Sequence, residues 1–133
     1  MNLRLTVEDR EARAEMARFP DKMERAVRGA IEDVSALLLR EAQTYPQQRP
    51  GTEYVRTGTL MRSWDRSPVQ GTGVNLWAIV GSDDNMAPYN RWVMDEAMQA
   101  AVHADLWRTI QAIARDNDDR AQSMFEARVR AEL

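Results

Sequence analysis

One apolar stripe constrains the fold of this 133-residue chain more than any other feature. Between residues 20 and 44, apolar side chains recur at steps of three and four, the spacing that places them on one side of an α-helix. The stripe consists of Met23, Val27, Ile31, Val34, Leu38 and Ala42. Pro20 suits a first turn, and Tyr45-Pro46 ends the helix because a residue before proline avoids helical geometry. We expect this helix of about six turns to pack against a sheet.

The composition describes one soluble domain without special chemistry. The length fits a single domain over residues 1–133, and 44% hydrophobic with 29% charged residues indicates a folded chain. The absence of cysteine excludes disulfides and thiolate metal sites. A net charge of −3 gives no general attraction to nucleic acid or anionic membranes. No apolar run could span a bilayer, and the N-terminus lacks a signal-peptide layout, so we expect no membrane association and synthesis in the cytosol.

Three further segments predict a small sheet. Residues 2–8 alternate apolar and polar side chains, as a strand with one buried face does. Residues 65–70 and 74–81 read as two strands joined by a hairpin loop at residues 71–73, where glycine reaches positive φ without strain. The second of these strands is apolar on both faces, since Trp77 and Ile79 alternate with other apolar residues. It therefore belongs in the middle of the sheet or at a subunit contact.

The rest of the chain is predicted to be mostly helical. A charged helix should cover residues 9–18, and residues 89–94 fit either a third strand or a short helix. A last helix starts near Leu106, but Asn117 falls where its stripe needs an apolar residue. There the helix is expected to bend, to break, or to leave the domain and project. The predicted fold class is α+β: an antiparallel sheet of about three to five strands packed against a long N-terminal helix and a C-terminal helix.

The segment between the two halves, residues 45–64, carries most of the unusual residues. Pro50-Gly51 signals a turn within a loop at residues 47–53, and a threonine at position 57 or 59 could cap a short helical turn. Four arginines cluster in and just beyond this crossing, and five carboxylates follow it. They are Arg49, Arg56, Arg62 and Arg66, and Asp83, Asp84, Asp95, Glu96 and Asp105. Either these are solvated surface, or a basic face meets an acidic face between identical copies.

No motif for catalysis or for a cofactor is present. The chain has no glycine-rich phosphate loop. Its single histidine, His103, could complete a catalytic triad only with a serine on a nucleophile elbow, and the sequence has no such serine. We expect His103 to be half-buried with one hydrogen-bonded nitrogen. Glu8 with Glu11 could be an acid and a base, but a carboxylate pair of unknown separation is uninformative. The aspartates around Asn117 lack the glycine and glutamate spacing of a calcium loop. We therefore predict no enzyme, no metal, no cofactor and no small-molecule substrate.

Two readings of the crossing remain. Bases and aromatics interleave there as they do in single-strand nucleic-acid binders, at Arg49, Tyr54, Arg56, Arg62, Trp64 and Arg66. This would suit a prophage-encoded nucleic-acid-binding regulator, although the acidic total charge and the lack of a module signature speak against it. The other interpretation of this segment depends on five sequence motifs along the chain.

Taken in order, the motifs are YPxxRPG after the long helix, YxRTGxLxRSW, a strand ending in VGS, APYNxWV, and QxxxHxxxW before the last helix. Together they resemble the tail-completion or neck family of long-tailed bacteriophages, whose members are often labelled putative tail-component or minor tail proteins. The likeness covers about residues 21–128. Its residues are Tyr45, Pro46, Arg49, Pro50, Gly51, Tyr54, Arg56, Thr57, Gly58, Leu60, Ser63, Trp64, Pro88, Tyr89, Val93, Gln99, His103 and Trp107.

This resemblance implies a virion structural protein without catalysis, made in the host cytoplasm and built into the neck. It implies a homo-oligomeric ring, expected to be a hexamer, between head connector and tail, contacting other neck and tail proteins, with DNA at most passing through the lumen. Tail terminator and head-closure proteins are alternatives within the class. We expect Arg56 and Arg62 to fix the crossing by pairing, and Tyr54, Trp64, Tyr89, Trp92 and Trp107 to form its apolar anchor. Structural or subunit-interface candidates are Arg49, Tyr54, Arg56, Arg62, Trp64, Trp77, Tyr89, Trp92, His103 and Trp107.

Overall fold

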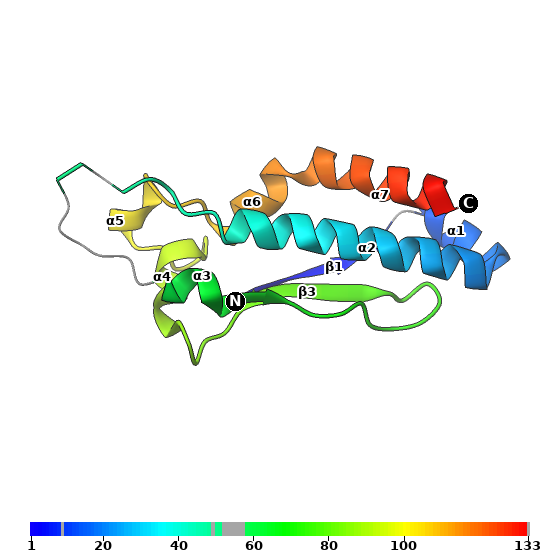
Figure 1. The fold of residues 1–133 in the computed structure, drawn as a ribbon, viewed down its shortest axis with the longest axis horizontal. Helices are drawn as coiled ribbons and strands as arrows, with labels where there is room; N and C mark the ends of the chain where they lie inside the picture. Colours follow the sequence, from blue (N-terminus) through cyan, green and yellow to red (C-terminus); the bar gives the residue numbers. More distant parts are fainter. Residues whose placement is uncertain (9, 49, 52–57, 133) are drawn as a thin grey trace.

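The computed structural model describes residues 1–8, 10–48, 50–51 and 58–132. It confirms the α+β class: a three-stranded antiparallel sheet packs against a long helix, and a C-terminal helix runs along the other side of that helix (Figure 1). The elements are β1 (Asn2–Thr6), α1 (Arg10–Arg18), α2 (Pro20–Ala42), α3 (Thr59–Ser63), β2 (Trp64–Arg66), β3 (Trp77–Ser82), the 3₁₀ turn η1 (Pro88–Asn90), α4 (Arg91–Met94), α5 (Ala101–Ala104), α6 (Ile110–Asp116) and α7 (Asp118–Glu132).

Helix α2 forms where the stripe predicts it, but it is buried on more than one side. Its buried residues include the small side chains Ala26, Gly29 and Ala30 as well as the predicted apolar stripe. The large side chains pack toward the sheet, and α7 lies along α2 on the side away from the sheet (Figure 1). Small residues permit this close approach of two helices. The expectation of a single sheet-facing stripe was therefore too narrow.

Strand β3 is the central strand, as its two apolar faces predict. The strand order is β1-β3-β2. Leu5 of β1 lies opposite Ala78 of β3, and Arg66 of β2 lies opposite Val80 of β3. Ala78 and Val80 are fully buried, whereas Trp77 and Ile79 on the other face are half-buried.

The predicted strand 65–70 is interrupted. Regular pairing ends at Arg66, and only an isolated bridge joins Gln70 to Trp77. The cause is local, because Pro68 has no N–H to donate and the Ser67 hydroxyl accepts the Ile79 N–H at 2.9 Å in place of a strand carbonyl. The other strand of the hairpin correspondingly begins at Trp77 rather than at residue 74.

The hairpin loop itself is built as expected and is tied to α2. Gly71 and Gly73 have φ of 86° and 58°. Arg28 on α2 donates to the carbonyls of Val69 (3.0 Å) and Gly71 (3.3 Å), and Glu24 accepts the Gly73 N–H at 3.4 Å. The loop is thus fixed by a helix that lies far from it in sequence.

The C-terminal half resolves the open alternatives. Residues 89–94 are helical rather than a strand, forming η1 and α4. Asn117 breaks the last helix: it is buried, its side-chain amide donates to the Ile113 carbonyl at 2.9 Å, and α7 starts at the next residue. The expected projection is wrong, because α7 returns along α2 (Figure 1).

The crossing is described only in part. Pro50 and Gly51 form the expected turn, while Arg49 and residues 52–57 lie outside the described residues. The predicted threonine cap is not present at α3, whose N-cap is Gly58 with a φ of 79° and no side-chain hydrogen bond. In the described part of the chain, no helix combines the length and the apolar character needed to cross a membrane.

Replacing Gly71 with alanine should destabilise the fold far more than the same change at Gly73. A β-carbon at Gly71 would lie 1.9 Å from the Asn75 carbonyl oxygen, whereas none of the described atoms lies within 4 Å of one at Gly73. We expect Gly73→Ala to lower the free energy of unfolding by about 1 kcal/mol, the penalty of positive φ alone, and Gly71→Ala to lower it by about 2–4 kcal/mol. Urea unfolding measures both, and equal losses would contradict the close backbone approach.

Candidate interaction surfaces

Five large apolar side chains between residues 86 and 102 are exposed. They are Met86 (45%), Tyr89 (42%), Trp92 (47%), Met98 (45%) and Val102 (67%), and we call them the aromatic surface. The turns and short helices that carry them gather at the end of the molecule opposite to α1 (Figure 1). Scattered single apolar residues on a surface are normal, but five within one segment make it a candidate interaction surface.

The segment that carries the aromatic surface is held firmly. The Ala100 N–H donates to the Trp92 carbonyl at 2.8 Å, and the side-chain amide of Gln99 donates to the carbonyls of Val93 and Trp107, both at 2.8 Å. The spacing of the residues explains why these two rings are exposed. Tyr89 and Trp92 are three residues apart and therefore lie on the same, outward face, whereas Val93 and Met94 lie on the opposite face and are buried. The exposed rings are thus presented by a rigid scaffold.

The predicted aromatic anchor is therefore only partly correct. Trp64 is 2% exposed and belongs to the core, and Trp107 packs edge-on against Tyr45 with ring centroids 5.1 Å apart. Tyr89 and Trp92, by contrast, are 42% and 47% exposed and lie outside the core, and the Arg91 guanidinium lies 5.5 Å from the centre of the Trp92 ring. Sequence reasoning missed this because an aromatic residue in a short helix can face either way.

Tyr45 does more than the sequence indicated. Its hydroxyl accepts the backbone N–H of Met61 in α3, so it joins the start of the crossing to its end. The same ring contacts Trp107 from beyond α5. One side chain thus holds together three segments that are far apart in sequence.

The remaining predicted residues are dispersed. Arg62 is exposed and its guanidinium lies 3.4 Å from the Thr59 hydroxyl. Trp77 lies on β3, with the Arg4 guanidinium 4.5 Å from its ring centre. His103 is half-buried as expected, and its ring has no hydrogen-bond partner among the described residues. Arg49, Tyr54 and Arg56 lie outside the described residues.

Some of the clustered charges are used within the chain. Glu96 and Arg115 form a two-pronged ion pair with both contacts at 3.1 Å, and the hydrogen bond and charge of Glu96 raise the Arg115 pKa. Asp95 accepts hydrogen bonds from Ala97 and Gln111. These two carboxylates therefore stabilise the segment behind the aromatic surface, a role that neither interpretation of the charge clusters predicted.

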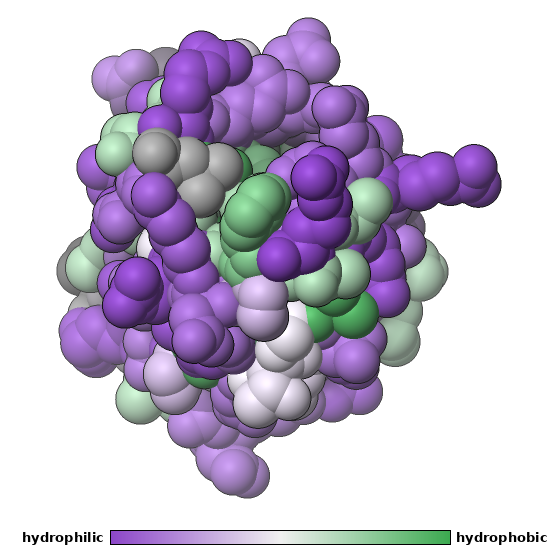
Figure 2. All heavy atoms as spheres, turned by 90° about the vertical axis from the view of Figure 1, so that its right-hand side faces the viewer, coloured by the Kyte–Doolittle hydropathy of each residue, from purple (hydrophilic) through white to green (hydrophobic). Residues whose placement is uncertain are grey.

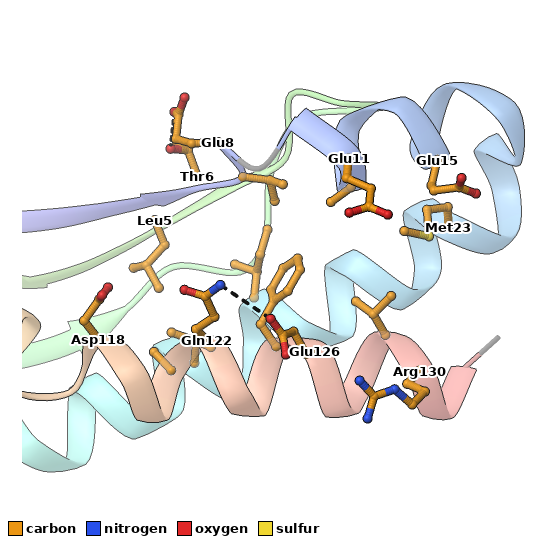
Figure 3. Close-up of a pocket in the computed structure, with 17 residues that line it drawn as sticks. Leu5, Thr6, Glu8, Glu11, Glu15, Met23, Asp118, Gln122, Glu126 and Arg130 are labelled. Carbon is orange, nitrogen blue, oxygen red and sulfur yellow. Dashed lines mark hydrogen bonds between the residues drawn. The ribbon is translucent and has the colours of Figure 1, made fainter.

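A second surface feature lies at the other end of the molecule. A groove of about 950 Å³ opens between β1 and α1 on one side and α7 on the other. Figure 2 shows apolar atoms in a hollow surrounded by polar ones, and Figure 3 shows the lining side chains. Its floor and walls are apolar, with Leu5, Val7, Ala12, Met23, Ile31, Val34, Ala121, Phe125 and Val129.

The rim of the groove is acidic. It carries five carboxylates and one guanidinium, at Glu8, Glu11, Glu15, Asp118, Glu126 and Arg130. We call the groove with this rim the acidic groove. The described residues contain no cluster of three potential metal ligands, so the carboxylates form no recognisable cation site. In the sequence, Glu8, Glu11 and Glu15 place a carboxylate at every third or fourth residue. This spacing is the sequence signal for the rim, although Glu8 and Glu11 alone gave no evidence of acid–base chemistry.

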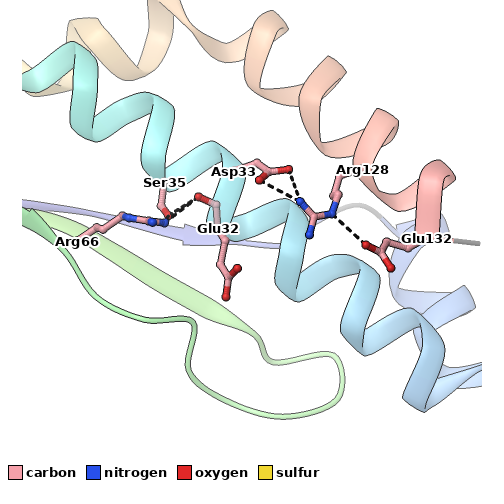
Figure 4. A network of polar contacts seen from close by, with 6 residues as sticks. All are labelled: Glu32, Asp33, Ser35, Arg66, Arg128 and Glu132. Atoms are coloured by element: carbon pink, nitrogen blue, oxygen red, sulfur yellow. Dashed lines mark hydrogen bonds and ion pairs between the residues drawn. The ribbon is translucent and has the colours of Figure 1, made fainter.

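Helix α7, one wall of the groove, is fixed to α2 by a partly exposed ion pair. Both oxygens of Asp33 accept from Arg128, at 3.0 and 3.1 Å, and Glu132 accepts from the same guanidinium at 3.2 Å (Figure 4). The Asp33 hydrogen bond and charge, followed by Glu132, raise the pKa of Arg128. On the other side of α2, Arg66 donates to the Glu32 carbonyl and the Ser35 hydroxyl, at 2.9 and 3.1 Å, which ties β2 to the same helix.

Comparisons with protein-family models, with curated proteins and with solved structures found nothing that matches the chain. The assignment of a function therefore depends on the sequence motifs and on the surfaces described above.

Replacing Arg128 with methionine should loosen α7. The change keeps the aliphatic stem but removes three contacts to Asp33 and Glu132, so amides of residues 118–132 should exchange hydrogen faster and the melting temperature should fall. Because the pKa of Arg128 is raised from an already high value, its guanidinium stays charged throughout neutral pH and loses its charge, with the stabilisation, only in strongly alkaline solution; at low pH the stabilisation is lost instead when the two carboxylates are protonated. Arg130→Met is the matched control on the same helix, and equal effects of the two changes would contradict this role.

Proposed function

We propose that this chain is a structural, non-enzymatic subunit of a bacteriophage neck, which joins head connector and tail as one copy in an oligomeric ring. The proposal starts from the motif resemblance over residues 21–128. The observation that carries it further is the exposure of Tyr89 and Trp92, which belong to the APYNRWV motif. A motif whose aromatic rings face solvent serves contact with another molecule better than it serves packing.

The chemistry of the aromatic surface suits a subunit contact. Aromatic and methionine side chains are enriched at the centres of protein interfaces, where single residues contribute most of the binding energy. A subunit that binds the next copy through different patches closes into a ring when the rotation permits. Other neck and tail proteins would then stack on the ring, and DNA would at most pass through its lumen. Tail termination and head closure would use the same kind of ring.

The nucleic-acid-binding alternative has less support. Two of the residues that suggested it are engaged inside the protein: Trp64 is buried, and Arg66 donates to α2. A buried indole cannot stack on a base, and a guanidinium held by a carbonyl and a hydroxyl is a poor phosphate ligand. No feature of the described residues favours this function over a ring.

Gene order tests the proposal without any protein chemistry. A position between connector or capsid genes and the gene of the major tail-tube protein supports a neck protein. A position beside a repressor or an operator, away from virion genes, contradicts it.

Changing Tyr89 and Trp92 to serine should abolish ring formation. The double change removes two exposed rings from the proposed contact, and loss of interface centres of this kind weakens association by roughly 30-fold or more, equivalent to about 2 kcal/mol. Light scattering over a concentration series and negative-stain microscopy report the assembly.

The control is Phe19→Ser, which removes an equally exposed aromatic ring, 53% accessible, at the junction of α1 and α2. We expect that variant to assemble normally. Rings that survive the double change would exclude the aromatic surface as the contact. A wild-type protein that stays monomeric and shifts DNA mobility in a salt-dependent manner would favour the regulator instead.

A further inference from the structure

We propose that the acidic groove binds a basic amphipathic helix from another polypeptide. This inference goes beyond the proposed function, since it concerns the end of the molecule opposite to the aromatic surface and would hold for a chain with another role. It follows from the shape, the lining and the charge of the groove.

The walls of the groove have the form of a helix receptor. On α7 two parallel rows face it at steps of four residues, a polar row that starts at Asp118 and an apolar row that starts at Ala121. On the opposite side Glu11 and Glu15 form the edge of α1, while α2 supplies the floor (Figure 3). A helix laid between two helices packs its ridges into their grooves, which is a common mode of peptide recognition.

The apolar lining is incompletely covered by the chain itself. Met23 and Ile31 in the floor are 4% and 3% exposed, but Leu5, Phe125 and Val129 above them are only half-buried. These three side chains contact the core from one side and the groove from the other. A partner with an apolar face would bury the side that remains exposed.

The charge selects a basic partner. Five carboxylates stand around the apolar lining against one guanidinium. Within the described residues, Glu15 is the one rim carboxylate in an ion pair, with Arg18 at 3.9 Å on the same helix, whereas Glu8 and Glu126 accept hydrogen bonds from the neutral side chains of Thr6 and Gln122. Lysine or arginine residues flanking an apolar stripe would place opposite charges along both edges, which favours association and fixes orientation.

The length of the wall sets the length of the occupant. From Asp118 to Arg130 the groove follows α7 for about 18 Å, which matches a helix of roughly 12 residues. The predicted ligand is thus a segment of three to four turns with apolar residues at helical spacing and basic residues on both sides of that stripe.

A model peptide tests this directly. The probe is a leucine–lysine peptide of about 14 residues with the leucines at helical spacing. Two control peptides keep its length: one has the same composition in shuffled order, and one has glutamate in place of lysine. We expect calorimetry with the full chain to show one-to-one binding of the probe alone, and circular dichroism to show a gain of helix on binding.

Two matched pairs of substitutions locate the site. Glu11→Gln with Glu126→Gln removes one rim carboxylate from each wall and should weaken binding roughly threefold to tenfold. Asp119→Asn with Glu32→Gln removes two exposed carboxylates outside the groove and should leave the affinity within about twofold, because distant surface charges are screened by salt. All four positions are exposed, so thermal melting should show folded proteins in both cases.

Several outcomes would overturn the proposal. Absence of binding, equal effects of the two pairs, or equal binding of the shuffled or acidic peptide would each exclude a site for a basic amphipathic helix. Binding without gain of helix would point to strand pairing along β1. Self-association of the unliganded chain that the rim pair abolishes would show that a second copy occupies the groove. None of these results depends on whether Tyr89 and Trp92 mediate a ring.

Discussion

The structure depends on the burial of α2 on two sides. The sheet covers one side of this 23-residue helix and α7 covers another, so α2 has few residues in contact with solvent over its central turns. Each large apolar side chain buried in this way contributes about 1.5–3 kcal/mol relative to exposure. Three elements are fixed to α2 by arginine side chains: the hairpin through Arg28, β2 through Arg66, and α7 through Arg128.

As a consequence, the acidic groove and the aromatic surface lie at opposite ends of α2. The acidic groove uses the N-terminal half of α2 as its floor, whereas the aromatic surface belongs to segments that pack against the C-terminal half through the larger apolar cluster. A helix of this length is about 35 Å long. The two ends are thus too far apart for one small ligand to reach both.

Sequence reasoning succeeded where periodicity decides the structure. The long apolar stripe predicted α2, the strand with two apolar faces predicted a central β3, and the glycines predicted the hairpin loop. It was less successful where one residue competes with a pattern. Ser67 and Pro68 interrupt a strand that their neighbours would form, and Asn117 breaks the C-terminal helix into α6 and α7, both of which stay packed on α2. The sidedness of Tyr89 and Trp92 could not be predicted either, because a helix as short as α4 has no pattern long enough to define its inner face.

The acidic groove could not have been predicted from the sequence, for a different reason. Its walls come from segments more than a hundred residues apart, Glu11 and Glu15 in α1 and Glu126 in α7, and only the return of α7 along α2 brings them to one rim. Each carboxylate by itself is an ordinary residue on the solvated side of a helix. Packed interiors have low compressibility and transmit strain, and α2 is packed on two sides, so an occupant that displaced α2 would also shift the segments that carry the aromatic surface.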